Sequence, residues 1–213
     1  MFCEIDNILF PNDCEVLEIV PRNIYVYPIF KNGSSSLKEL EKFSVVKNHE
    51  IRSIQSPITV FLRDPKQRFI SGVNTYVRKI KQSNPELDQN TVLWCVKNYL
   101  FLNRHYMPQF FWLINLARYS TVPLNLESVN NINKYTPLHS RAGVEPPDSW
   151  LTTALADMDW KKLELYFYFD QLLIEKIGSL ITFKELLNSI KTNQPDLYDL
   201  VFGHSKSLID VLS

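Results

Sequence analysis

The sequence predicts an α/β fold in which a small, mainly parallel β-sheet is covered by helices on both faces, giving three layers. One observation is the alternation of short apolar segments, rich in β-branched and aromatic residues, with longer amphipathic segments. This alternation is typical of parallel strands joined by crossover helices. A second observation is composition: 45% of the 213 residues are hydrophobic and only 5 are glycine, which favours a folded domain over a low-complexity chain.

The length is that of one domain, so we expect a single domain over residues 1–213. Its strands and phosphate motifs are concentrated at residues 23–80. The remainder, residues 84–213, is predicted to be mainly helical, with a loop at about residues 133–150.

The first strand is predicted at residues 24–30, where the sequence IYVYPIF combines β-branched and aromatic side chains. A Gly-Ser turn at residues 31–36 follows the strand. Leu37, Leu40 and Phe43 then recur at helical spacing, which predicts a helix. The order in this part of the chain is therefore strand, turn and helix.

A short strand is predicted at residues 44–46, and the apolar run at residues 57–62 has the continuous character of a buried parallel strand. Pro65 is well placed as the first residue of a helix that runs to about residue 81. Further helices are predicted at residues 90–102, 109–119, 160–178 and 183–191 and from residue 196 onward, with a short strand at 123–126 and a polar loop at 133–149.

Charge and cysteine content exclude several classes. Lys+Arg and Asp+Glu number 23 each, whereas a general nucleic-acid binder carries a basic surplus. No apolar run approaches the ~18 residues of a membrane span, and residues 1–9 lack the basic region of a signal peptide. The three cysteines, Cys3, Cys14 and Cys95, form no CxxC pair, which is typical of a protein in a reducing compartment. We therefore expect a cytoplasmic protein that has no transmembrane segment and does not bind nucleic acid.

The turn at residues 31–36, KNGSSS, has the features of an anion-binding loop. Backbone N–H groups converge where a strand leads into a helix, the helix N-terminus adds partial positive charge, and serine hydroxyls donate further hydrogen bonds. Gly33 allows a close approach that a side chain would block, and Lys31 can place its ammonium group over the same anion. The segment is not a Walker A motif, because its lysine precedes the glycine. A serine that only caps a helix is the alternative.

A second group of polar residues follows the predicted strand at residues 57–62. Arg63 leaves this strand and Ser71 lies two turns into the next helix, so both can reach one anion at the carboxyl edge of the sheet. Arginine suits phosphate because its guanidinium group donates two hydrogen bonds at once. Residues 63–81 contain six basic residues and one acidic residue. Arg68 has an alternative structural role, in which it ties the helix to the sheet.

These two segments resemble motifs of one enzyme family. Residues 27–37, YPIFKNGSSSL, resemble the 5′-phosphosulfate-binding loop of sulfotransferases that use 3′-phosphoadenosine 5′-phosphosulfate (PAPS). Residues 61–65, FLRDP, with Arg68, Ser71 and Tyr76, resemble the family's 3′-phosphate-binding motif, RDPxxRxxSxxxxY. The two motifs also stand in the family's order along the chain.

The resemblance implies a P-loop-like domain whose nucleotide-binding core is residues 23–80. It also implies that Lys31 supports catalysis at the oxygen that bridges phosphate and sulfate. Two weaker similarities are to the RKGxxGDWK segment of cytosolic sulfotransferases, at residues 140–150, and to an HWxPQ-like stretch of carbohydrate sulfotransferases, at residues 103–109. The residues implied to bind the nucleotide are Lys31, Asn32, Gly33, Ser34, Ser35, Ser36, Arg63, Ser71 and Arg141.

Three residues are candidates for the general base. Lys47-Asn48-His49 is similar to the Lys-Thr-His of cytosolic sulfotransferases, in which the histidine is the base, so His49 is the first candidate. His105, in the HWxPQ-like stretch, is the second. Glu50 is the third, because carboxylates take this role in some relatives.

The resemblance therefore implies a sulfotransferase that moves the sulfuryl group of PAPS to a hydroxyl acceptor by in-line displacement, leaving 3′,5′-ADP, with no metal required. The partner is a small-molecule or carbohydrate hydroxyl acceptor, and no oligomeric state is predicted. Two alternatives stay open, a nucleotide-dependent phosphotransferase and a non-catalytic nucleotide-binding module of the same fold.

Overall fold

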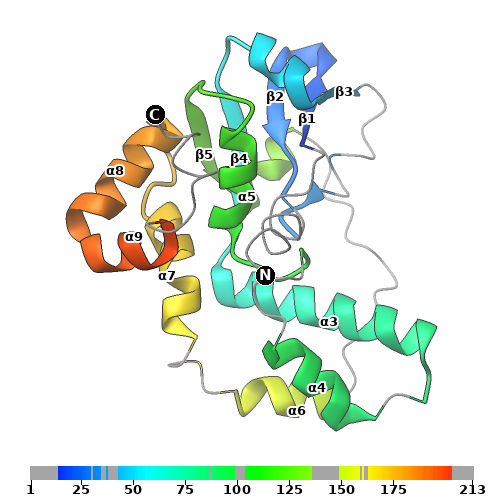
Figure 1. Ribbon diagram of the computed structural model, residues 1–213. Helices are drawn as coiled ribbons and strands as arrows, with labels where there is room; N and C mark the ends of the chain where they lie inside the picture. Colours follow the sequence, from blue (N-terminus) through cyan, green and yellow to red (C-terminus); the bar gives the residue numbers. More distant parts are fainter. Residues whose placement is uncertain are drawn as a thin grey trace.

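The computed structural model describes residues 14–29, 31–34, 37, 43–86, 88–98, 104–135, 149–158, 160 and 163–202. These residues form a six-stranded mixed sheet flanked by helices (Figure 1). The order of strands across the sheet is β3-β1-β2-β4-β5-β6. The strands are β1 Glu15–Ile19, β2 Ile24–Tyr27, β3 Phe43–Lys47, β4 Ile58–Leu62, β5 Leu124–Ser128 and β6 Leu180–Ile181.

The centre of the sheet is parallel and its margins are antiparallel. Tyr27 of β2 pairs with Val60 of β4, and Leu62 of β4 pairs with Ser128 of β5, in parallel register. β1, β3 and β6 each run antiparallel to their neighbours. The sequence predicted a mainly parallel sheet, whereas the sheet is mixed. One reason is that β1, which was not predicted, pairs with β2 as an antiparallel hairpin.

Most of the described chain after β4 is helical. Asp64 caps the first of these helices by accepting a hydrogen bond from the Gln67 backbone N–H at 2.8 Å, and Pro65 occupies the first helical position. The helices are α3 Pro65–Ser83, α4 Gln89–Asn98, α5 Gln109–Ala117, α6 Ser149–Ala156, α7 Glu164–Ile174, α8 Phe183–Asn193 and α9 Pro195–Phe202, with 3₁₀ turns η1 Val20–Arg22, η2 Asn48–Ser53 and η3 Val129–Lys134.

Both faces of the sheet are covered. On one face, Val60 and Leu62 of β4 belong to a core with α5, α7 and α8, and Figure 1 shows α5 in front of β4. On the other face, Phe61 packs with Leu37 and with Ile132 of η3. All five residues of β4 are buried, as a strand covered on both faces requires. The predicted three-layer arrangement is therefore present around the central strands.

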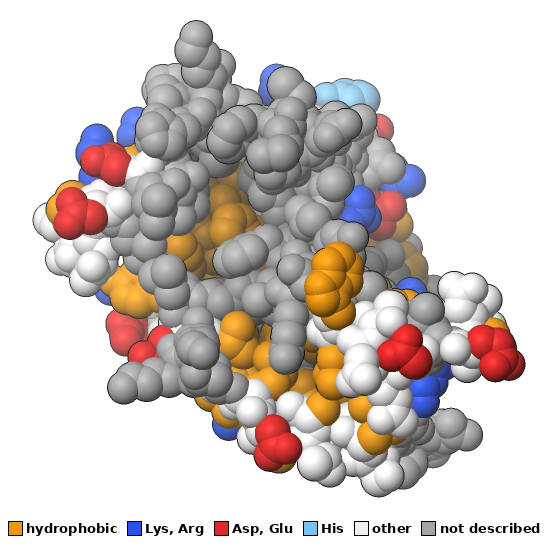
Figure 2. All heavy atoms as spheres, turned by 60° about the horizontal axis from the view of Figure 1, so that its bottom comes forward, with side chains coloured by type: hydrophobic (Ala, Val, Ile, Leu, Met, Phe, Trp, Pro, Cys, Tyr) orange, Lys and Arg blue, Asp and Glu red, His pale blue; other side chains and the backbone are white. Residues whose placement is uncertain are grey.

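A separate core lies at the end of the molecule where α3, α4 and α6 meet. Phe69 and Val73 of α3 are fully buried there with Val92 of α4 and Leu151 of α6. Figure 2, which brings this end forward, shows hydrophobic side chains that reach the surface among polar ones. Trp94 of α4 is 57% exposed. This part of the molecule positions α3, whose first turns follow β4.

Several predicted elements are present and others differ. The strands predicted at residues 24–30 and 57–62 correspond to β2 and β4. Phe43 was predicted to end the helix at residues 37–43, but it begins β3, because it pairs with Ile19 of β1. Helix α6, at the end of the predicted polar loop, was not predicted. Within the described part of the chain, no helix combines the length and the apolar character that a membrane span needs.

Candidate functional site

The carboxyl ends of four strands lie at one edge of the sheet. β2, β4 and β5 are parallel, and β3 has the same direction as β2 because both are antiparallel to β1. In open α/β sheets, ligands bind at this edge, outside the carboxyl ends of the parallel strands. The two phosphate motifs follow β2 and β4, which are neighbours in the sheet. The fold therefore brings both motifs to the same part of this edge.

The loop after β2 is a tight turn that leads into a helical turn. The Asn32 N–H donates to the Ile29 carbonyl at 3.2 Å, and the Leu37 N–H donates to the Gly33 carbonyl at 3.1 Å. The second bond spans four residues, as in an α-helix. The predicted sequence of strand, turn and helix start is therefore present, and Lys31, Gly33 and Ser34 are half-buried within it.

The backbone of this loop is left-handed on both sides of Asn32. Lys31 has a φ of 69° and Gly33 a φ of 79°. This φ favours glycine, and a Cβ atom at Gly33 would lie 2.4 Å from Cδ1 of Ile132 in η3, so the Ile132 side chain would have to shift to admit one. Lys31 adopts the same region without that freedom, at a cost of about 1–3 kcal/mol. Strain of this kind is typical of functional loops.

Arg63, Lys31 and the first turns of α3 form one group. Arg63 is half-buried, and its Nη1 donates to the Lys31 carbonyl at 3.3 Å. Burial lowers the pKa of Arg63 and the neighbouring Asp64 raises it. Lys31 Nζ donates to Thr75 Oγ1, and the Thr75 hydroxyl donates to the Ser71 carbonyl at 3.2 Å. The structure thus brings Lys31, Arg63 and the segment that carries Ser71 together.

The segment before α5 packs tightly on α3. A Cβ atom at Gly72 of α3 would lie 2.2 Å from the His105 carbonyl oxygen and 2.7 Å from Tyr106 Cβ. Arg68 is 1% exposed, and its Nη1 donates to the Met107 carbonyl. Arg68 therefore has the structural role that the sequence left as an alternative, although it ties α3 to this segment and not to a strand.

A buried hydrogen-bond network behind the loop was not predicted. Asn32 is 2% exposed, and its Nδ2 donates to the Phe61 carbonyl at 2.7 Å and to Gln109 Oε1 at 2.5 Å. The same Gln109 Oε1 accepts from the Arg63 N–H at 2.9 Å, and Gln109 Nε2 donates to the Arg63 carbonyl at 2.9 Å. Asn32 was predicted to bind nucleotide, but its amide nitrogen is used to hold the loop against β4.

Asp170 of α7 supports this network. It is 1% exposed, and its carboxylate accepts from the backbone N–H groups of Gln109 and Phe110, both at 2.9 Å. These are the first two N–H groups of α5, so Asp170 caps a helix whose own N-cap, Pro108, offers no side-chain acceptor. Burial raises the pKa of Asp170, whereas Arg68 and these hydrogen bonds lower it. The sequence signal was a single acid within the apolar run LYFYFDQLLI.

His105, the second candidate base, is held by Lys79. The two atoms Nε2 of His105 and Nζ of Lys79 are 3.1 Å apart, and Nε2 must accept because an ammonium group has only donors. Burial, then the positive charges of Lys79, Lys31 and Arg68, lower the pKa of His105 to about 4. A general base works best with a pKa near the working pH. This environment therefore makes His105 a weak proton acceptor.

His49 and Glu50, the other candidate bases, lie in η2 after β3 and are exposed. Glu50 accepts a hydrogen bond from the Lys47 N–H at 3.2 Å. β1 separates β3 from β2, so the strand that leads to His49 lies two strand spacings, about 10 Å, from the strand that leads to Lys31. His49 therefore lies farther along the same edge than the Lys31–Arg63 group. Ser35, Ser36 and Arg141, also predicted to bind nucleotide, lie outside the described residues.

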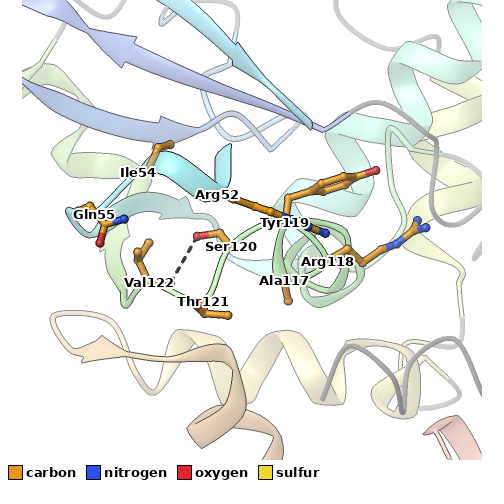
Figure 3. A pocket seen from close by; sticks show the side chains of 9 residues that line it. All are labelled: Arg52, Ile54, Gln55, Ala117, Arg118, Tyr119, Ser120, Thr121 and Val122. Atoms are coloured by element: carbon orange, nitrogen blue, oxygen red, sulfur yellow. Dashed lines mark hydrogen bonds between the residues drawn. The ribbon is translucent and has the colours of Figure 1, made fainter. Parts of the chain in front are cut away.

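A cavity of about 490 Å³ lies at the opposite edge of the sheet. It is lined by Arg52 and Gln55 before β4 and by residues 117–122 before β5 (Figure 3). The Ile58 N–H donates to the Pro123 carbonyl at 3.1 Å next to it, which places the cavity at the amino ends of these strands. This cavity is thus distinct from the phosphate motifs.

The chain was compared with models of protein families, with curated proteins and with solved structures. None of the three comparisons gives a match for this chain. No family is therefore assigned, and the geometry at the carboxyl edge of the sheet is the basis of the functional proposal.

Proposed function

We propose that the chain is a PAPS-dependent sulfotransferase with a P-loop-like phosphate site. The observation that carries this proposal is the joining of two cationic segments from adjacent parallel strands. Arg63 Nη1 donates to the Lys31 carbonyl at 3.3 Å, so the guanidinium group and the loop after β2 are direct neighbours. Two such segments suit a nucleotide that carries phosphate groups at both its 5′ and its 3′ positions.

The donor set at this edge fits an anionic nucleotide. It consists of the Lys31 ammonium group, the Arg63 guanidinium group, the Ser71 hydroxyl and the backbone N–H of Ser34 after Gly33. These are the group types that bind phosphate in proteins. The nearest acid in sequence, Asp64, is occupied as the N-cap of α3. The local charge therefore favours an anion.

In the proposed reaction, PAPS supplies a sulfuryl group on a phosphate leaving group. Arg63 and Ser71 hold the 3′-phosphate, and the loop at residues 31–36 holds the 5′ end. Lys31 neutralises the charge that develops on the phosphate oxygen as the S–O bond to it breaks. His49 takes the proton of the acceptor hydroxyl as its oxygen bonds to sulfur. The acceptor therefore lies along the edge between His49 and Lys31, where β3 and β2 end.

Two observations make the non-catalytic alternative an outcome of the test. His105 is a weak base and His49 lies at the end of a strand two positions away from β2. A module that binds nucleotide without turnover would need only the Lys31–Arg63 group.

The test is binding followed by turnover. We expect 3′,5′-ADP to bind more tightly than ATP in isothermal titration, and PAPS to be desulfated when hydroxyl acceptors of the sugar, phenol, lipid and peptide classes are supplied. Tighter binding of ATP would favour a phosphotransferase. Binding of 3′,5′-ADP without desulfation in any acceptor class would favour the non-catalytic module.

A further inference from the structure

Gln109 uses its whole side-chain amide on two segments of the candidate site. It is fully buried at the start of α5. Its Oε1 accepts from Asn32 Nδ2 at 2.5 Å and from the Arg63 N–H at 2.9 Å. Its Nε2 donates to the Arg63 carbonyl at 2.9 Å and to Asp170 Oδ2 at 3.1 Å. The amide thus makes four hydrogen bonds, which is its full capacity.

The two bonds to Arg63 involve its backbone N–H and its backbone carbonyl. Gln109 therefore holds the chain where it leaves β4, much as a neighbouring strand would. The direction of the Arg63 side chain depends on this backbone, so Gln109 acts on the guanidinium group without touching it.

The third bond reaches the loop after β2. Asn32 lies between two residues in the left-handed region, Lys31 with a φ of 69° and Gly33 with a φ of 79°. A loop held in this conformation needs an anchor, because each strained residue costs about 1–3 kcal/mol. Asn32 is that anchor, since its Nδ2 is bound both to Gln109 and to the Phe61 carbonyl.

Asp170 fixes which way the Gln109 amide points. Its carboxylate accepts from Gln109 Nε2 at 3.1 Å and from the Gln109 N–H at 2.9 Å. Both Asp170 oxygens accept hydrogen bonds from backbone N–H groups, so the amide nitrogen of Gln109 faces Asp170 and its oxygen faces Asn32 and the Arg63 N–H. The orientation of one buried amide is thereby set by a helix far along the chain.

We infer that Gln109 is the positioning residue of the nucleotide site, where it holds the Lys31 loop and Arg63 at the separation that lets both bind one nucleotide. The inference rests on the proposed function for the identity of the ligand. The connection between the two segments does not depend on the proposed function, because it consists of hydrogen bonds that the structure contains.

The test replaces Gln109→Met, which keeps the approximate volume and removes all four hydrogen bonds. Asn115→Leu is the matched control, because Asn115 is a second buried amide of α5, 4% exposed and close to Tyr27. Both proteins are studied at a temperature at which circular dichroism shows them folded. Two quantities are measured: the affinity for 3′,5′-ADP by titration calorimetry, and the hydrogen exchange of the Arg63 amide by NMR without nucleotide.

We expect Gln109→Met to bind 3′,5′-ADP at least about tenfold more weakly, the loss expected when one charged phosphate contact is misplaced. The Arg63 amide should lose protection in the same variant, and Asn115→Leu should change neither quantity. A folded Gln109→Met protein with native affinity would overturn the inference. Equal losses of affinity in both variants would also overturn it, since that result means general destabilisation.

A second variant, Asn32→Ala, applies if Gln109→Met does not fold. It removes only the loop side of the connection, so the affinity for 3′,5′-ADP should fall while the Arg63 amide stays protected. Retained affinity would overturn the positioning role. If the unaltered protein binds no 3′,5′-ADP at all, the proposed function is wrong. Loss of Arg63 amide protection in Gln109→Met would in that case still support the connection between the two segments.

Discussion

Replacing Arg63→Ala should remove most of the preference for a nucleotide that carries a 3′-phosphate. Arg63 is half-buried at the end of β4, where water competes less for its guanidinium group than on an open surface. A hydrogen bond between charged partners contributes about 1.5–3 kcal/mol, so the dissociation constant for 3′,5′-ADP should rise about 10–150-fold. The weak Nη1 contact with the Lys31 carbonyl, at 3.3 Å, is lost in the same variant.

Thermal denaturation reports this change. At a hundredfold excess over its dissociation constant, 3′,5′-ADP should stabilise the unaltered protein by about 2.7 kcal/mol, which raises the melting temperature by roughly 5–11 °C. At the same concentration the Arg63→Ala protein should gain only about 0.3–1.3 kcal/mol, a shift of roughly 1–5 °C. 5′-AMP should give a small shift that is similar in both proteins, because it has no 3′-phosphate.

Arg52→Ala is the matched control, because Arg52 is exposed and lines the cavity at the opposite edge of the sheet. Its response to 3′,5′-ADP should equal that of the unaltered protein. Two results would refute the reasoning. One is an unchanged shift with 3′,5′-ADP in Arg63→Ala; the other is equal shifts from 3′,5′-ADP, 5′-AMP and ATP in the unaltered protein, which would indicate a generic phosphate loop.

Three further substitutions test other parts of the site. Lys31→Ala should lower the rate of sulfuryl transfer by a factor of about 10²–10³ in an assay coupled to 3′,5′-ADP release, with the melting temperature nearly unchanged. Near-native turnover would contradict the role of Lys31. The control is Lys184→Ala, since Lys184 is exposed on α8. His49→Ala should lower turnover by about 10²–10⁴ without weakening donor binding, whereas an active His49→Ala beside an inactive His105→Ala would move the base to His105. Gly72→Ala should lower the free energy of unfolding by about 1–3 kcal/mol, measured by urea denaturation, because the new Cβ would lie 2.2 Å from the His105 carbonyl oxygen. An unchanged urea midpoint would mean that the segment before α5 shifts freely.

The elements around the two phosphate motifs were predictable because their signals are local. β4 is a run of five buried residues, four of them apolar, and the Asp64-Pro65 pair marks the start of α3 within a few residues of it. The loop after β2 has a glycine at a position with a φ of 79°, which agrees with its predicted turn. Patterns of this kind depend on neighbours within one or two turns of chain, so a single sequence is enough to detect them.

The sheet topology was less predictable because strand direction is set by pairing between distant segments. β1, with the sequence EVLEI, has two glutamates among three apolar residues and does not strictly alternate, and its burial depends on pairing with both β2 and β3. That pairing gives the sheet its antiparallel margin. It also gives β3 the direction of β2, so β3 ends at the same edge as Lys31, and His49 follows that end by two residues.

The hydrogen bonds that hold the phosphate segments together are the part of the site that sequence patterns conceal. Asn32 and Gln109 are 77 residues apart, and Gln109 and Asp170 are 61 residues apart. None of the three stands in a motif for its role as a buried connector, because a buried amide or carboxylate is favourable only where its partners are already in place. The phosphate motifs supply the charged groups, whereas the separation between those groups is set from α5 and α7. Variants at Asp170 should therefore alter nucleotide affinity although Asp170 lies behind Gln109 and not in the motifs themselves.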